Sequence, residues 1–91
     1  MALRKIGEPI RSLHGEHLDD LTTTGVWHQG RSLDASTSLG YPVPVAGLLE
    51  VHAPARARMV YQRYTCFNSG DVYHRGAYDN VWQPWKRLQT T

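Results

Sequence analysis

The C-terminal end of the chain limits the possible folds more than any other stretch. Residues 72–78 have the β-branched and aromatic content of a strand, and the polar pair that follows supplies a turn. Trp82 and Trp85 come next, with Pro84 between them. A long helix is excluded there, because proline fixes its own φ and biases the preceding residue towards an extended backbone. We predict that the two indoles close over a small core, where their burial contributes about 4–6 kcal/mol.

The rest of that core must be small, because 91 residues allow one domain at most. The single cysteine, Cys66, has no partner for an internal disulfide, and small unstapled domains often gain stability by oligomerising. A formal net charge of +2 indicates no particular partner. No apolar run approaches a membrane span, and no signal-peptide hydrophobic region follows Met1. We therefore expect synthesis in the cytoplasm without a signal peptide, and no membrane insertion.

From residue 46 onward the sequence predicts an antiparallel meander of three strands. The second strand covers residues 59–67 and the third covers 72–78, with turn chemistry at 68–71. Apolar residues alternate along the first strand, and this set should face the core. Its members are Gly47, Leu49, Val51 and Ala53.

The last hairpin carries mixed side chains on both faces. With the loop at residues 68–71, Phe67 is expected opposite Val72, and Tyr61 opposite Tyr78. A sheet with water on one side alternates cleanly between apolar and polar residues, and neither face does so here. We therefore expect both faces to be covered, one by the core and the other by the N-terminal segments or a neighbouring subunit.

The first half of the chain has weaker signals. Residues 1–16 lack a sustained period and are interrupted by glycine and proline, which predicts a connecting arm before a domain at 17–91. Residues 17–21 favour one helical turn, and residues 26–29 a short strand. Residues 30–38 are typical of a loop.

Few residues are candidates for catalysis or metal binding. No spacing pairs Cys66 with a histidine base, and a strand cysteine is more typical of buried packing. His14 and His17 have a spacing that suits one metal on a helix, but Gly15 disfavours that helix. We predict a protein that is not an enzyme and has no cofactor and no metal.

Aromatic rings beside planar polar groups are what sugar-binding surfaces use, and the loops contain such residues. Trp82 is a further candidate, although a structural role is favoured for it and for Trp85. Basic residues among the aromatics also suit nucleic acid, but the weak net charge favours a solvated rim, so no nucleic-acid partner is expected. The predicted ligand-binding residues are Tyr41, Tyr78, Asp79 and Asn80.

Several separated motifs follow one another in a characteristic order. Residues 17–27 read His-Leu-Asp-Asp-Leu-Thr-Thr-Thr-Gly-Val-Trp, and residues 47–51 are a glycine-led apolar strand. A Gln-x-Tyr segment, an aromatic-x-Arg segment and a Trp-x-x-Trp ending follow. These are Gln62 and Tyr64, Tyr73 and Arg75, and Trp82 and Trp85. In order and spacing, over residues 17–88, the motifs resemble the knob domain in tail fibres of R-type pyocins and many tailed bacteriophages. Thr24 departs from that pattern, because proline is usual there.

The resemblance implies a small β-rich knob, all-β or α+β with at most one short helical turn, built as an antiparallel meander or sandwich. It also implies a homotrimer in the virion tail that contacts the bacterial host surface, with a glycan as the expected partner and no catalytic residues. The alternative is a structural adaptor or decoration protein, joined to other tail proteins through residues 1–16. Fibre knobs are generally modules of long chains, so we expect either a small separate tail protein or an excised fragment.

Overall fold

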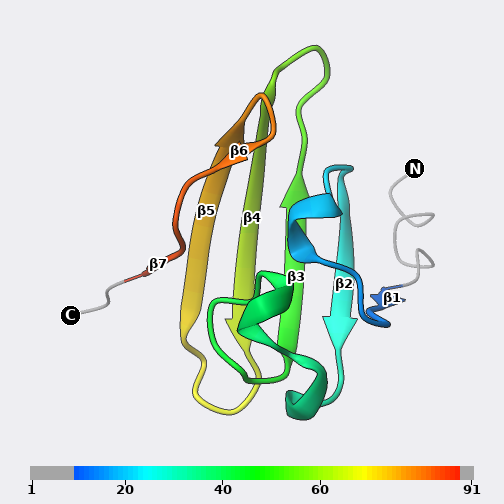
Figure 1. Cartoon of the computed structure of the whole chain (residues 1–91), viewed down its shortest axis with the longest axis vertical. Coiled ribbons are helices and arrows are strands. Elements are labelled where there is room, and N and C mark those ends of the chain that lie inside the picture. The colour runs from blue at the N-terminus through cyan, green and yellow to red at the C-terminus, as the bar shows by residue number, and fades with distance from the viewer. Residues whose placement is uncertain (1–9, 89–91) are drawn as a thin grey trace, which may run out of the picture.

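Residues 10–88, the part of the chain that the computed structural model describes, form one seven-stranded sheet (Figure 1). Short 3-10 turns are the only helical segments among them. The prediction of a β-rich fold with little helix is confirmed. The strands are β1 (Arg11–Ser12), β2 (Gly25–Gln29), β3 (Gly47–His52), β4 (Met59–Cys66), β5 (Val72–Tyr78), β6 (Val81–Trp82) and β7 (Lys86–Arg87). The 3-10 turns are η1 (Leu18–Asp20), η2 (Ser32–Asp34) and η3 (Thr37–Leu39).

The strand order is β1-β2-β3-β4-β5-β6, with β7 also on β5. Only β1 and β2 pair in parallel, and β3, β4 and β5 form the antiparallel meander predicted from the sequence. The C-terminal segment runs antiparallel to β5, first as β6 and then as β7. Pro84, which has no N–H to donate, lies in the gap between these two pairings. The gap lets the chain leave the edge of the sheet around Trp85.

The pairing of β4 with β5 differs from the predicted register by two residues. Tyr61 lies opposite Gly76 rather than Tyr78, and Thr65 lies opposite Val72. The turn occupies residues 67–70 because Gly70, with a φ of 75°, donates its N–H to the Cys66 carbonyl. A shift of two residues preserves the side-chain alternation, so each face carries the residues that the sequence predicted.

The core lies on one face of the sheet, under the loops that contain η1, η2 and η3 (Figure 1). Gly47, Leu49 and Val51 of β3 are buried there, as predicted, and Ala53 is half-buried. The predicted helical turn exists as η1. Nine buried residues form the core cluster: Leu13, Leu18, Trp27, Ala35, Tyr41, Leu49, Val51, Tyr64 and Cys66.

The opposite face of the sheet is open within the described residues. Phe67 is 69% exposed and Tyr61 is 49% exposed, and Met59 and Tyr78 are exposed as well. The N-terminal segment after residue 9 does not cover this face, because Leu13 and Leu18 both pack into the core on the other side. Of the two covers expected from the sequence, the described N-terminal residues do not provide one, and a neighbouring subunit stays a prediction.

The second part of the predicted arm joins the sheet. Arg11 and Ser12 pair with Trp27 and His28, and the Leu13 N–H donates to the His28 carbonyl at 2.9 Å. Residues 1–9 lie outside the described residues, and the division into an arm at 1–16 and a domain at 17–91 stays a prediction. No helix among residues 10–88 is long and apolar enough to cross a membrane.

Candidate functional site

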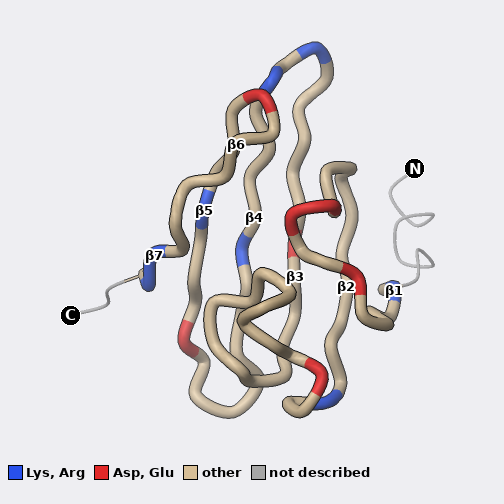
Figure 2. The backbone as a smooth tube through the Cα atoms, in the orientation of Figure 1, with Lys and Arg blue, Asp and Glu red and all other residues tan. Residues whose placement is uncertain are grey.

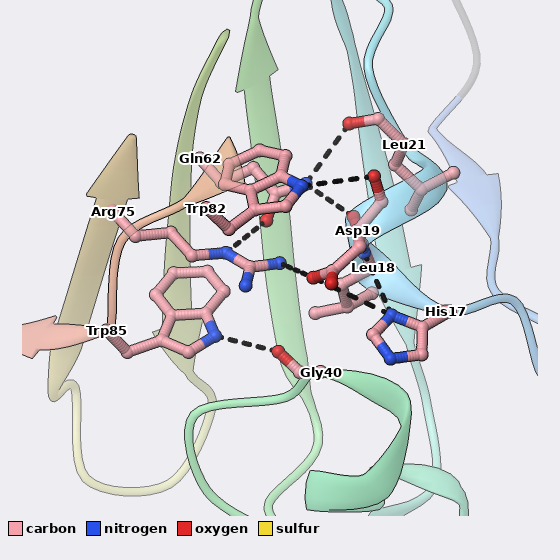
Figure 3. Close-up of polar contacts among 9 residues, drawn as sticks. All are labelled: His17, Leu18, Asp19, Leu21, Gly40, Gln62, Arg75, Trp82 and Trp85. Carbon is pink, nitrogen blue, oxygen red and sulfur yellow. Dashed lines mark hydrogen bonds and ion pairs between the residues drawn. The ribbon is translucent and has the colours of Figure 1, made fainter. Parts of the chain in front are cut away.

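Arg75 occupies the centre of a cluster that joins the sheet to the loops above it. Strand β5 points this side chain to the covered face, where it is 6% exposed. Its guanidinium lies between two indole rings, 4.2 Å from the Trp82 ring centroid and 4.5 Å from that of Trp85 (Figure 3). A guanidinium held against aromatic faces and away from water is attracted by the quadrupole of each ring.

Two polar side chains complete the environment of this guanidinium. The Arg75 Nε–H donates to Gln62 Oε1 at 2.9 Å, from the residue opposite it on β4. Arg75 Nη2 lies 2.9 Å from Asp19 Oδ1, and both atoms are shielded from water. Burial lowers the pKa of Arg75 from its ordinary value, and the carboxylate of Asp19 opposes this shift. The guanidinium remains charged at neutral pH, because its pKa starts so high.

Gln62 extends this network to the turn η1. Its Nε2 donates to the Leu18 carbonyl at 2.7 Å and to the Leu21 carbonyl at 3.1 Å. The Leu18 carbonyl also accepts from the Leu21 N–H within the turn, so this amide binds one carbonyl inside η1 and one at its C-terminal end. The buried Gln62 therefore fixes η1 on the sheet and places Asp19 opposite Arg75.

The two indoles attach the C-terminal segment to separate parts of the chain. Trp82 Nε1–H donates to the Asp19 carbonyl at 3.2 Å, and Trp85 Nε1–H donates to the Gly40 carbonyl at 2.7 Å (Figure 3). Gly40 has a φ of 87° and ends η3, a conformation that favours glycine. Both rings are half-buried. They hold the loop regions against β5.

The remaining two motif residues, Tyr64 and Tyr73, lie directly opposite each other on β4 and β5. The Tyr64 hydroxyl donates to the Val45 carbonyl at 2.6 Å, and its ring packs edge-on against Tyr41 at 5.5 Å. Burial raises the pKa of Tyr64 strongly, because the ionised phenolate would lose its hydration. The motif residues named from the sequence therefore occupy one continuous stretch of the covered face.

The structure separates the four residues predicted to bind a ligand. Tyr41 is only 3% exposed, and its hydroxyl accepts from Gln29 Nε2 at 3.1 Å, so the prediction of an exposed ring is wrong. Residues 40–45 fold back over the sheet and carry this ring into the core. Tyr78 is 53% exposed but lies on the open face.

Asp79 and Asn80 form the tight turn between β5 and β6. Their φ values of 55° and 66° are left-handed, which these two residue types tolerate better than most. Asp79 Oδ1 lies 3.6 Å from Arg58 Nε in an exposed ion pair. Asn80 lies on the side of the turn that faces η1.

Asn80 belongs to a hollow of about 370 Å³ between η1 and the β5–β6 turn. Within residues 10–88, no hydrogen bond or ion pair engages the side chains of Asp20, Thr22 or Asn80. Figure 2 shows acidic residues at η1 and at the β5–β6 turn. It is lined by Asp19, Asp20, Thr22, Asn80 and Trp82.

Sequence reasoning named Asn80 and Trp82 as candidates for this surface, but it assigned Asp19, Asp20 and Thr22 no ligand role. These residues meet Trp82 only because its Nε1–H donates to the Asp19 carbonyl, 63 positions earlier in the chain. No local pattern in the sequence indicates that contact. A second, larger hollow of about 550 Å³ lies on the open face. Its polar lining includes Glu50, His52, Arg63 and His74.

Cys66 and His17, which the sequence raised as possible reactive or metal-binding groups, both lie in structural positions. Cys66 is buried, and desolvation raises the pKa of its thiol, which disfavours the nucleophilic thiolate. His17 caps η1 by accepting from the Asp19 N–H at 3.1 Å. No three histidine, cysteine, aspartate or glutamate side chains in this range gather as metal ligands.

Comparison with solved structures identifies close fold relatives. An N-truncated R2-type pyocin tail fibre is 33% identical, with a TM-score of 0.79 over 92% of this chain and 34% of the fibre chain. An R1 pyocin fibre of P. aeruginosa is 32% identical, with a TM-score of 0.78 over 92% of this chain and 22% of that one. The chain thus spans about a third or less of the fibres it matches.

A tailspike of Acinetobacter phage vb_AbaP_AS12 has a TM-score of 0.77 over 93% of this chain and 16% of the tailspike. At 20% identity, this likeness shows the fold alone. No family model matches the chain, and no curated protein does.

Proposed function

We propose that this protein, which resembles R-type pyocin tail fibres in both fold and sequence, is a non-enzymatic tail-fibre domain that contacts the bacterial host surface. The observation that carries the proposal is the agreement with R-type pyocin fibres, at about a third of residues identical over nine tenths of the chain. Its place is the tail of a virion or of a phage-tail-like particle. The surface ligand is a glycan.

The open face of the sheet supports assembly as a homotrimer. Aromatic and apolar side chains are exposed on it, and the exposure of Phe67, Tyr61 and Tyr78 lies between 49% and 69%. Large exposed aromatic and apolar side chains on one face of a small domain often mark an interaction site. Three copies that pack these faces around one axis would remove the exposed rings from water. Tyr78 then acts at the contact between subunits rather than at a ligand.

The glycan contact falls on the other side of the sheet, at the hollow beside the β5–β6 turn. Of the residues predicted from the sequence, Asn80 lines this hollow, and Trp82 provides its aromatic surface. Asp79 serves the turn through its positive φ and its ion pair with Arg58. Ligand and neighbouring subunits therefore use opposite faces of the domain.

Two measurements test this function. Light scattering on the purified chain should give three times the mass of 10.3 kDa. Immobilised surface polysaccharide from the host should retain the protein, and free polysaccharide should release it. A monomer that binds no fraction of the host surface would contradict the proposal.

A structural adaptor is the second candidate, with residues 1–16 joining other tail proteins. The pairing of β1 with β2 favours it, because it holds the described part of this arm, from Arg11 onward, on the sheet. Deleting residues 1–9 separates the two functions and spares Leu13 of the core. A host-binding domain should keep its glycan after this deletion, whereas an adaptor should be lost from the particle.

A further inference from the structure

We propose that the hollow lined by Asp19, Asp20, Thr22, Asn80 and Trp82 is a subsite for one uncharged sugar ring that excludes acidic sugars. This inference rests on the proposed glycan contact and specifies its chemistry. Three observations carry it: a rigid aromatic surface, polar groups without partners, and an excess of negative charge.

The aromatic surface is Trp82. One side of its indole ring is occupied by Arg75 at 4.2 Å, and its Nε1–H is engaged by the Asp19 carbonyl. The ring is therefore fixed in place before any ligand arrives, and its remaining accessible surface contributes to the hollow. Preorganised rings lose little conformational entropy on binding, and the apolar C–H face of a sugar suits such a surface.

The polar groups around this ring have unused hydrogen-bonding capacity. Among residues 10–88, the side chains of Asp20, Thr22 and Asn80 make no hydrogen bonds or ion pairs. A carboxylate accepts from hydroxyl groups, an amide both donates and accepts, and a hydroxyl does either. A few such groups that converge on an aromatic surface are characteristic of small-ligand sites. A ring with several hydroxyls matches this set better than an apolar ligand does.

Charge decides which sugars fit. Asp19 and Asp20 both line the hollow, and no lysine, arginine or histidine does. The guanidinium of Arg75 neutralises only Asp19, with its Nη2 atom turned away from water. A sugar bearing a carboxylate or phosphate would meet the charge of Asp20 without compensation. The hollow therefore selects for uncharged rings.

The turn residues offer a matched pair of variants. Asn80→Gly removes the amide that lines the hollow, and a φ of 66° suits glycine, so folding should not suffer. Asp79→Gly makes the same change one position earlier, where φ is 55° and the side chain lies outside the hollow. Thermal unfolding of both variants verifies that the fold is intact.

The experiment is an NMR titration of the ¹⁵N-labelled chain with methyl glycosides. Methyl glucoside, galactoside, mannoside and N-acetylglucosaminide are compared with methyl glucuronide, whose ring carries a carboxylate. At least one uncharged glycoside should shift the Trp82 indole N–H and the Asn80 amide, and the glucuronide should bind at least 10-fold more weakly. Asn80→Gly should weaken binding about 10-fold, which is 1.4 kcal/mol, and Asp79→Gly should change it less than 2-fold.

A second variant tests the charge argument. Asp20→Asn keeps a polar side chain and removes the negative charge, so the preference over the glucuronide should shrink several-fold. Equal binding of both sugar types by the unaltered chain would overturn the proposal. So would shifts of these signals by calcium chloride alone, because the hollow would then be a cation site.

The outcome for this subsite is separable from that for the proposed function. If the Asn80→Gly and Asp20→Asn variants bind host polysaccharide as tightly as the unaltered chain, the subsite assignment is wrong and surface attachment stands. If the unaltered chain itself binds no host polysaccharide and no glycoside, both proposals are wrong.

Discussion

Substitution of Arg75 by methionine should destabilise this domain more than any change at an exposed arginine. Methionine keeps a long apolar side chain between the two indoles, so little cavity forms. The substitution removes the charged guanidinium, its 2.9 Å contacts with Gln62 Oε1 and Asp19 Oδ1, and its attraction to both indole rings.

The magnitude follows from how completely the site is shielded from water. Breaking a buried ion pair by removing one partner costs about 3–5 kcal/mol, because the other charge stays behind unpaired. Part of the Asp19 side chain reaches water, at 43% exposure, so we expect the lower end of that range, about 3 kcal/mol. The free energy of unfolding of a domain of this size is about 5–10 kcal/mol, so the variant should remain folded but be much less stable.

The stability of Arg75→Lys should lie between that of the unaltered chain and that of Arg75→Met. An ammonium group keeps the charge but lacks the planar fork that reaches Gln62 and Asp19 at once while lying flat against the indoles. We expect a loss of about 1–2 kcal/mol, consistent with one charged hydrogen bond.

Urea unfolding measures these losses, with tryptophan fluorescence and far-UV circular dichroism as probes. Arg31→Met is the matched control, because Arg31 also pairs with an aspartate, at 3.7 Å from Asp34, but is 70% exposed. Exposed pairs contribute about 0–1 kcal/mol, so this variant should unfold close to the unaltered chain. The reasoning is refuted if Arg75→Met loses no more stability than Arg31→Met, or if Arg75→Lys is neutral.

Three further predictions concern Trp85, the close packing at Gly47 and the buried ionisable side chains. Trp85→Phe should cost about 1–2 kcal/mol in urea unfolding, because the Gly40 carbonyl loses its 2.7 Å donor; an unchanged midpoint would contradict this. Gly47→Ala should lower the free energy of unfolding by about 3 kcal/mol, because the new methyl group would lie 2.1 Å from the Thr65 carbonyl oxygen. Gly76→Ala is the control in the same assay and should be near neutral, because its methyl group would lie 3.7 Å from the Val60 carbonyl oxygen. Burial raises the pKa values of Tyr41, Tyr64 and Cys66 above their ordinary values of 10.0 for tyrosine and 9.0 for cysteine. The folded state is therefore fully stable below those ordinary values and loses stability as the pH rises above them. The urea concentration at the unfolding midpoint should decrease from about pH 8 to pH 11, and a constant midpoint would refute this.

The strands were predictable because their signals are local. Residues 72–78 form β5 with the bounds expected from their β-branched and aromatic content, and the alternation of Gly47, Leu49 and Val51 correctly gave the buried face of β3. The two-residue error in the β4–β5 register arose at the turn, where the positive φ of Gly70 moved the reversal of the chain. The prediction of which side chains share a face stays correct after such an error, because side chains alternate between the faces with a period of two.

Exposure of single residues was less predictable. Tyr41 and Tyr78 are both tyrosines near turns, yet the first is buried and the second is on the open face. Their environments differ because residues 40–45 fold back over the sheet, and no nearby residue signals that path. The partners of Asn80 in the hollow were missed for the same reason.

Sequence alone determined the central strands β3, β4 and β5 of this protein, since the alternation of side chains and the chemistry of the turns act within a few residues of each other. It also supplied every residue of the Arg75 cluster as a motif. Only the tertiary structure decided that these motifs meet, that η1 lies beside the β5–β6 turn, and that one face of the sheet remains open. Those outcomes depend on contacts between residues 41–63 positions apart, for which the sequence carries no local signal.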